Sequence, residues 1–151
     1  MFNYDKFIVS YDNQKTGGLF MPKKGDLYEV ILSETHISWG EHRHTNSREV
    51  IKREHFIPIP KAEAKRIGIY NRDRGQGIGK NEFRAISADG IYKGIVKVSG
   101  SSSSGDPYAK NISESGDLKG FHEWFCSANI TPGTKIRVEW LSPTEILFTK
   151  I

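Results

Sequence analysis

Arginine is concentrated in one third of this chain, between Glu41 and Arg84. That stretch holds seven of the eight arginines, and with four lysines and six acidic residues its net charge is +5, against +4 for the whole chain of 151 residues. The guanidinium group offers five donors in a rigid fork that fits a phosphate or a guanine edge, whereas lysine acts mainly as a point charge. A segregated arginine block therefore indicates a surface that meets nucleic acid, and an ordinary solvated basic face is the alternative.

The same stretch carries histidines that could bind a metal. His42 and His44 would share one face if their segment were a strand, because side chains two positions apart point the same way. Spacing fixes no third ligand beside them. We therefore predict solvated histidines, with no metal and no cofactor.

Catalytic signatures are absent from the sequence. The segment 75–80 has the glycines of a phosphate-binding loop, but no apolar strand precedes it and no Ser/Thr and helix follow Lys80, so we interpret it as a loop that lies beside phosphates. Cys126 is the single cysteine, which rules out an intrachain disulfide or a thiolate zinc site, and we predict that it packs as a small hydrophobic residue behind Trp124 and Phe125. Since no triad or paired-carboxylate spacing occurs either, the chain is predicted to be a binding module and not an enzyme.

The elements that must position these side chains are mostly strands. Short β-branched or alternating segments predict strands over 27–32, 81–86, 91–98, 134–140 and 145–149, with Ile37–Gly40 extending the first of them into a polar arm. Prolines bar the extended segment 56–60 from a sheet interior. A short helix is expected over 61–67, ended by Gly68, and a second over 117–126 with Asp117 as its N-cap, while Trp124 and Trp140 are expected in the core.

Length and composition predict one domain over residues 1–151. No apolar run approaches the 18 residues of a membrane-spanning helix, so no membrane partner is expected. The N-terminal residues lack a hydrophobic signal core, which favours a cytoplasmic, nucleoid-associated location.

Two segments resemble a known family. Ile-Ser-Trp-Gly-Glu-His-Arg at 37–43, followed by Glu-His-Phe-Ile-Pro-Ile-Pro-Lys-Ala-Glu-Ala at 54–64, is similar to the DNA-binding domain at the C-terminus of phospholipase-D-type restriction endonucleases. The resemblance covers about residues 27 to 150 and leaves 1–26 as an unmatched extension packed on or beside the barrel. It implies the fold of plant B-three transcription-factor domains, which is a mainly β, seven-stranded open pseudobarrel with two short α-helices.

The resemblance also implies a function, which is sequence-selective binding of double-stranded DNA through two arms in the major groove. Matched residue by residue, the first arm is 38–47 and the second is 99–111. The base contacts expected from the two arms are Trp39, Glu41, Arg43, His44, Asn46, Ser102, Tyr108 and Asn111, with a core anchor at the base of the arm as the alternative for Trp39. The phosphate contacts expected beside them are Arg48, Arg53, Arg72, Arg74, Lys80 and Lys110. The chain would be the recognition domain of a restriction-modification type protein, with a catalytic nuclease domain or subunit as a further partner.

Two other classes of function stay open at this point. One is a small metal-dependent nuclease or RNA-processing enzyme that uses the histidines and Arg43 of the first arm. The other is a barrel that binds proteins.

Overall fold

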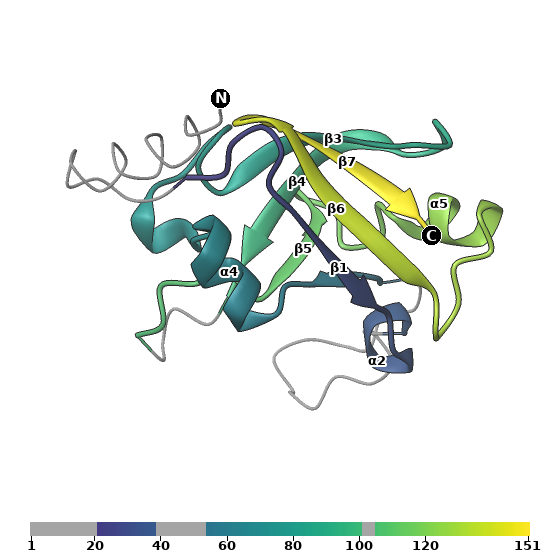
Figure 1. The fold of residues 1–151 in the computed structure, drawn as a ribbon. Helices are drawn as coiled ribbons and strands as arrows, with labels where there is room; N and C mark the ends of the chain where they lie inside the picture. Colours follow the sequence, from purple (N-terminus) through teal and green to yellow (C-terminus); the bar gives the residue numbers. More distant parts are fainter. Residues whose placement is uncertain (1–20, 39–53, 101–104) are drawn as a thin grey trace, which may run out of the picture.

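The computed structural model describes residues 21–38, 54–100 and 105–151, and these parts form one seven-stranded sheet that curls into a nearly closed barrel (Figure 1). Neighbouring strands are antiparallel except β7 and β3, which are parallel. The predicted fold class, a mainly β pseudobarrel, is confirmed. The order of strands in the sheet is β1 (Leu27–Ile31), β6 (Lys135–Ser142), β7 (Glu145–Lys150), β3 (Glu82–Ser87), β4 (Lys93–Ser99), β5 (Asn111–Glu114) and β2 (Ile57–Pro58).

The barrel has an open seam between β1 and β2, the two ends of the sheet order. A proline has no backbone N–H to donate, so a strand that contains Pro58 and is followed by Pro60 suits an edge, as the sequence predicts. Across the seam the Tyr28 hydroxyl donates a hydrogen bond to the Pro58 carbonyl over 3.0 Å. One buried side chain therefore joins the two edges that no backbone ladder connects.

Alternation along the strands decides which side chains enter the barrel. In β6, Ile136, Val138 and Trp140 are fully buried, while the residues between them are only partly so. Strand β7 pairs with β6 and contributes Ile146 and Phe148 to the same interior. This hairpin and the core position of Trp140 are confirmed as predicted.

Helix α4 (Lys61–Ile67) begins after Pro60 and ends at Gly68, as predicted. Gly68 adopts φ +89°, a left-handed conformation that glycine adopts without steric cost. A helical turn that the sequence did not predict, α2 (Glu34–Ile37), stands where we expected β1 to continue. Its first turn is capped because the Ser33 backbone N–H donates to His36 Nδ1 over 2.9 Å.

Helix α5 (His122–Ser127) begins later than predicted. Asp117 does not cap it, because its carboxylate accepts a hydrogen bond from the Lys119 N–H within a local turn. Gly120 packs so closely on Glu114 that an added Cβ would lie 2.4 Å from the carboxyl carbon, so tertiary packing fixes the backbone here. No helix in the described parts of the chain is long and apolar enough to cross a membrane.

Candidate nucleic-acid interface

Eight of the predicted contact residues lie outside the described residues, and nothing is stated of their placement. They are Trp39, Glu41, Arg43, His44, Asn46, Arg48, Arg53 and Ser102. The metal-dependent alternative for His42 and His44 falls on the same undescribed segment. The structure does place the segments from which both predicted arms leave the barrel.

A cavity of about 210 Å³ lies at the point where these segments meet. His55 and Phe56 follow the first predicted arm along the chain, and they contribute to the same lining as Ser99 and Asn111, which begin and end the second. Ser113 and Leu118 complete the lining. Residues that lie eight and nine positions after the first predicted arm thus share one cavity with the two end residues of the second.

Pairing of β4 with β5 explains why these polar side chains gather. Ser99 lies opposite Asn111, and Lys97 lies opposite Ser113. The pair between them, Val98 and Ile112, is fully buried in the barrel interior, so the polar residues face outward. The Ser99 hydroxyl donates to Asn111 Oδ1 over 2.7 Å, which orients the amide of a predicted base-contacting residue.

A second, more polar hollow adjoins the first. It has a volume of about 310 Å³, and its lining includes Arg72, Asn81, Lys97 and Ser99. Ser99 contributes to the lining of both hollows, so the two are neighbours along β4. We call the lining of the two hollows together the polar concave face; it includes His55, Phe56, Leu118, Asn111, Ser113, Ser99, Lys97, Asn81 and Arg72.

Two buried asparagines hold the loop that brings Arg72 to this face. Asn71 is 2% exposed, and its side-chain nitrogen donates to the Asp106 carbonyl while its side-chain oxygen accepts from the Asp73 N–H. Asn81 is also buried, and its side chain accepts from the Gly77 N–H. The glycine-rich loop is therefore anchored at both ends, and to the segment that leads into β5.

The cations near this face form no ion pair with an acidic side chain in the described parts of the chain, although Lys110 is near enough to Asp106 to help lower the pKa of that carboxyl group. Among the described residues, the ion pairs of this region use Lys61 with Asp106, at 3.4 Å, and Arg66 with Glu63, at 2.6 Å. No ion pair in the described parts involves the predicted phosphate contacts Arg72, Arg74, Lys80 and Lys110, or Lys97. All of them except Lys97 are exposed.

Tyr108, a predicted base contact, is half-buried and stacks on Tyr70 with ring centroids 5.3 Å apart. The Arg74 guanidinium lies 5.2 Å from the centre of the Tyr70 ring, and the Lys65 ammonium lies 6.0 Å from that of Tyr108. The structure therefore brings Arg74 and Tyr108 together through a cation–aromatic stack.

His55 is fixed by hydrogen bonds from both ring nitrogens. Its Nδ1 donates to the Ile37 carbonyl, and its Nε2 lies 2.9 Å from His122 Nδ1. Because a carbonyl can only accept, His55 carries its proton on Nδ1, and the proton between the rings belongs to His122. Burial is the main cause that lowers the pKa of His55, and the neighbouring His122 lowers it further, while the hydrogen bond to Ile37 acts in the opposite direction. The neutral imidazole is thus a rigid part of the cavity wall.

The prediction that Cys126 is buried is wrong. Its side chain is exposed on α5, with Sγ 3.5 Å from His122 Nε2. The helical phase explains this, because Trp124 and Phe125 occupy the inward face, and the next residue must turn outward. In the described parts, no group of three or more histidine, cysteine or acidic side chains is placed to hold a metal ion.

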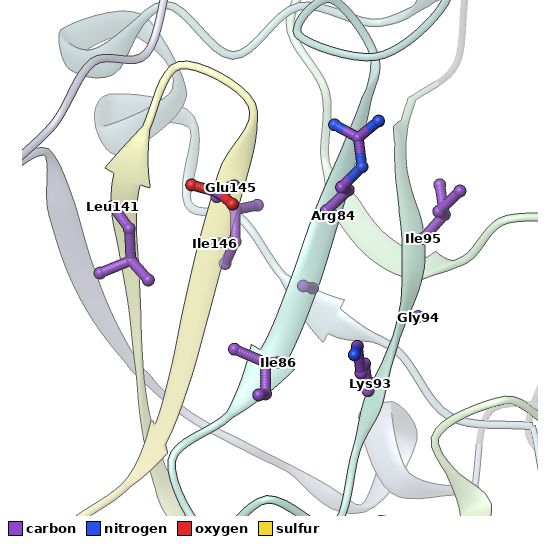
Figure 2. A pocket seen from close by; sticks show the side chains of 9 residues that line it. Arg84, Ile86, Lys93, Gly94, Ile95, Leu141, Glu145 and Ile146 are labelled. Carbon is purple, nitrogen blue, oxygen red and sulfur yellow. The ribbon is translucent and has the colours of Figure 1, made fainter.

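A larger pocket of about 370 Å³ lies on the outer surface of β3, β4, β6 and β7 (Figure 2). Figure 2 shows Ile86, Ile95 and Leu141 around it, and each is about 40% exposed. Arg84 and Glu145 lie opposite each other in the parallel β3–β7 pair and also line it. Lys93 also lines this pocket, but none of its lining residues belongs to the polar concave face, so the pocket is separate from the candidate interface.

Sequence reasoning assigned only Asn111 and Arg72 of the polar concave face to DNA contacts. The residues that it did not assign are His55, Phe56, Asn81, Lys97, Ser99, Ser113 and Leu118. The alternation of Lys97 and Ser99 with buried Val96 and Val98 was a usable signal, because it places both on the outer surface of β4. Comparisons with protein-family models, with curated proteins and with solved structures find no match for this chain.

Proposed function

We propose that this chain binds double-stranded DNA sequence-selectively and serves as the recognition domain of a restriction-modification type protein. The observation that carries the proposal is the shared cavity, because its lining combines His55 and Phe56, which follow the first expected arm along the chain, with Ser99 and Asn111, which begin and end the second. Such a domain would act in the cytoplasm, at the nucleoid, together with a catalytic nuclease domain or subunit.

Five cations that form no ion pair in the described parts of the chain support this proposal. Arg72, Arg74, Lys80, Lys97 and Lys110 lie on or near the segments that form the polar concave face, and none is held in an ion pair with a described residue. Each phosphate that such a side chain neutralises releases a counterion, so affinity falls steeply with salt. In this proposal, the arms probe base edges in the major groove while these residues hold the phosphates.

Salt titration of duplex binding tests the proposal. With about five phosphates held, the log–log slope of affinity against salt should be about −4 to −5. Arg72→Ala and Lys97→Ala should each weaken binding to all sequences alike and flatten that slope by about one unit. Lys135→Ala removes the same charge from β6, where Lys135 pairs with Glu29, and it should leave the slope unchanged. A slope near zero would contradict the proposal.

A binding role and an enzymatic role separate in a second assay. The proposed domain reads DNA without cutting it, so the purified chain should leave plasmid intact with Mg²⁺ or Mn²⁺ added. Nicking that disappears on substitution of His42 or His44 would favour the small metal-dependent nuclease instead.

A further inference from the structure

The cavity at the base of the two predicted arms is a small chamber with a mixed lining. His55, Phe56 and Leu118 supply ring and aliphatic surface, and Ser99, Asn111 and Ser113 supply polar groups. We propose that it receives one nucleobase, an adenine, swung out of the duplex. This inference rests on the proposed DNA binding, and it adds a binding site for a single base to it.

The size of the cavity favours one base. Its volume of about 210 Å³ lies below the roughly 300–1,000 Å³ of ordinary small-molecule pockets. A planar heterocycle suits this volume, whereas a base pair or a whole nucleotide does not. A flipped base leaves its sugar and phosphates outside the pocket that reads it.

The lining offers the two kinds of contact that a flipped base needs. Enzymes that flip bases hold the base between aromatic or apolar side chains and hydrogen-bond its edge. Phe56 is held in place by an edge-to-face contact with His36, with ring centroids 5.2 Å apart, and Leu118 is 41% exposed at the cavity. Both can cover a planar ring without moving a buried residue.

Asn111 supplies the edge contact. A carboxamide presents a donor beside an acceptor, which matches the amino group and the adjacent ring nitrogen of adenine. The Ser99 hydroxyl donates to Asn111 Oδ1 over 2.7 Å and so sets the direction of the amide before any base arrives. The oxygen keeps a second lone pair for the adenine amino group, and the NH₂ group remains a donor.

The cavity wall is preorganised. His55 is 8% exposed, stacks on Phe125 with centroids 4.7 Å apart, and is held by the Ile37 carbonyl and His122. Ser113, on β5, is 4% exposed. A base can therefore enter without reorganising the wall, which lowers the cost of binding it.

Base flipping also requires that the protein bind the DNA phosphates beside the extruded base, and the neighbouring polar hollow has the cations to do so. Arg72 and Lys97 line that hollow, and Ser99 belongs to both linings. Phosphates next to the flipped nucleotide would thus meet Arg72 and Lys97, and Lys97 lies two residues along β4 from Ser99, which orients Asn111. The two hollows form a base site and a phosphate site side by side.

The test uses the purified chain and a duplex selected from randomised sequences. Permanganate oxidises thymines that are not stacked, so the thymine left opposite a flipped adenine should react about tenfold faster in the complex than in free DNA. Replacing that thymine by an abasic site should tighten binding about tenfold, because part of the unpairing cost is removed.

Two variants separate the base site from DNA binding in general. Asn111→Ala should abolish the thymine reactivity and the gain from the abasic site, yet keep the salt slope and the melting temperature. Lys97→Ala should lower affinity and flatten the slope, but leave the thymine reactive in whatever complex forms. A saturable complex in which no thymine of either strand becomes reactive overturns the base site alone. Failure to bind any duplex overturns the proposed function itself.

Discussion

One side-chain hydrogen bond, from Tyr28 to Pro58, crosses the seam between β1 and β2, so Tyr28→Phe should weaken the barrel measurably. Tyr28 is 2% exposed, and its hydroxyl donates to the Pro58 carbonyl over 3.0 Å. Burial, helped by the Glu63 carboxylate, raises the pKa of the phenol well above its ordinary value, so the group remains a protonated donor at every pH of interest. Phenylalanine keeps the ring and removes only that donor.

The expected loss follows from the surroundings of the acceptor. A neutral hydrogen bond contributes about 1 kcal/mol to stability, and a carbonyl left dry adds a further penalty. Pro58 is only half-buried, so water can reach part of its carbonyl, and we expect a total of about 1–2 kcal/mol. For a domain of this size, the melting temperature should fall by about 2–8 °C.

Urea denaturation followed by tryptophan fluorescence measures this change. Tyr92→Phe is the comparison, because its hydroxyl donates to the Glu114 carboxylate over 2.9 Å, away from the seam, and bonds to charged groups contribute about 1.5–3 kcal/mol. Tyr28→Phe should therefore destabilise the protein, but by less than Tyr92→Phe. This expectation is refuted if the free energy of unfolding of Tyr28→Phe lies within about 0.3 kcal/mol of that of the unchanged protein while that of Tyr92→Phe is lower. The hydrogen bond across the seam would then not hold the barrel closed.

Three further outcomes are expected. The pKa of His55 is lowered from 6.5 in the folded protein, so in acid the unfolded state binds more protons than the folded state. The contribution of His55 to stability is therefore fully present above about pH 6.5, and the free energy of unfolding falls below that pH by up to about 1.4 kcal/mol per pH unit. His55→Asn should flatten this dependence, measured as denaturant midpoints between pH 7.5 and 5. Gly100→Ala should cost about 1–3 kcal/mol in the same assay, since its Cβ would lie 2.7 Å from the Tyr108 carbonyl oxygen; equal stability would contradict this packing. The exposed Cys126 should react completely with a maleimide in the folded protein, and slow, unfolding-limited labelling in mass spectra would place it in the core after all.

Capping residues and the alternation of apolar residues predicted those helices and strands whose ends are set by neighbouring residues in the sequence. Helix α4 follows from Pro60 before it and Gly68 after it, and the β6–β7 hairpin follows from period-two alternation. The start of α5 could not be read in this way, because close packing of Gly120 on Glu114, across the turn after β5, overrides the helical spacing. The exposure of Cys126 was open to prediction, since the phase set by Trp124 and Phe125 already turns it outward.

The candidate site was less accessible to sequence reasoning. Asn111 was predicted from a family resemblance and Arg72 from the arginine-rich stretch around the glycine-rich loop, and the outward position of Lys97 was available from alternation. That His55 and Asn111 line one cavity depends on the antiparallel pairing of β2 with β5, a contact between residues more than fifty positions apart. No local pattern in a single sequence encodes such a pairing.

The parallel pairing of β3 with β7 has a consequence for how the chain folds. The sheet consists of two halves, β1–β6–β7 and β3–β4–β5–β2, and the strand pairing that joins them consists of the four residue pairs from Arg84–Glu145 to Ser87–Phe148. Contacts that span some sixty residues form slowly, because the intervening chain must be closed into a loop first. During synthesis the β3–β4–β5–β2 half is complete before residue 145 leaves the ribosome, and its β3 edge then has no partner. The emerging chain therefore carries an open template for strand addition until β7 arrives, which makes this interval its period of greatest risk of aggregation.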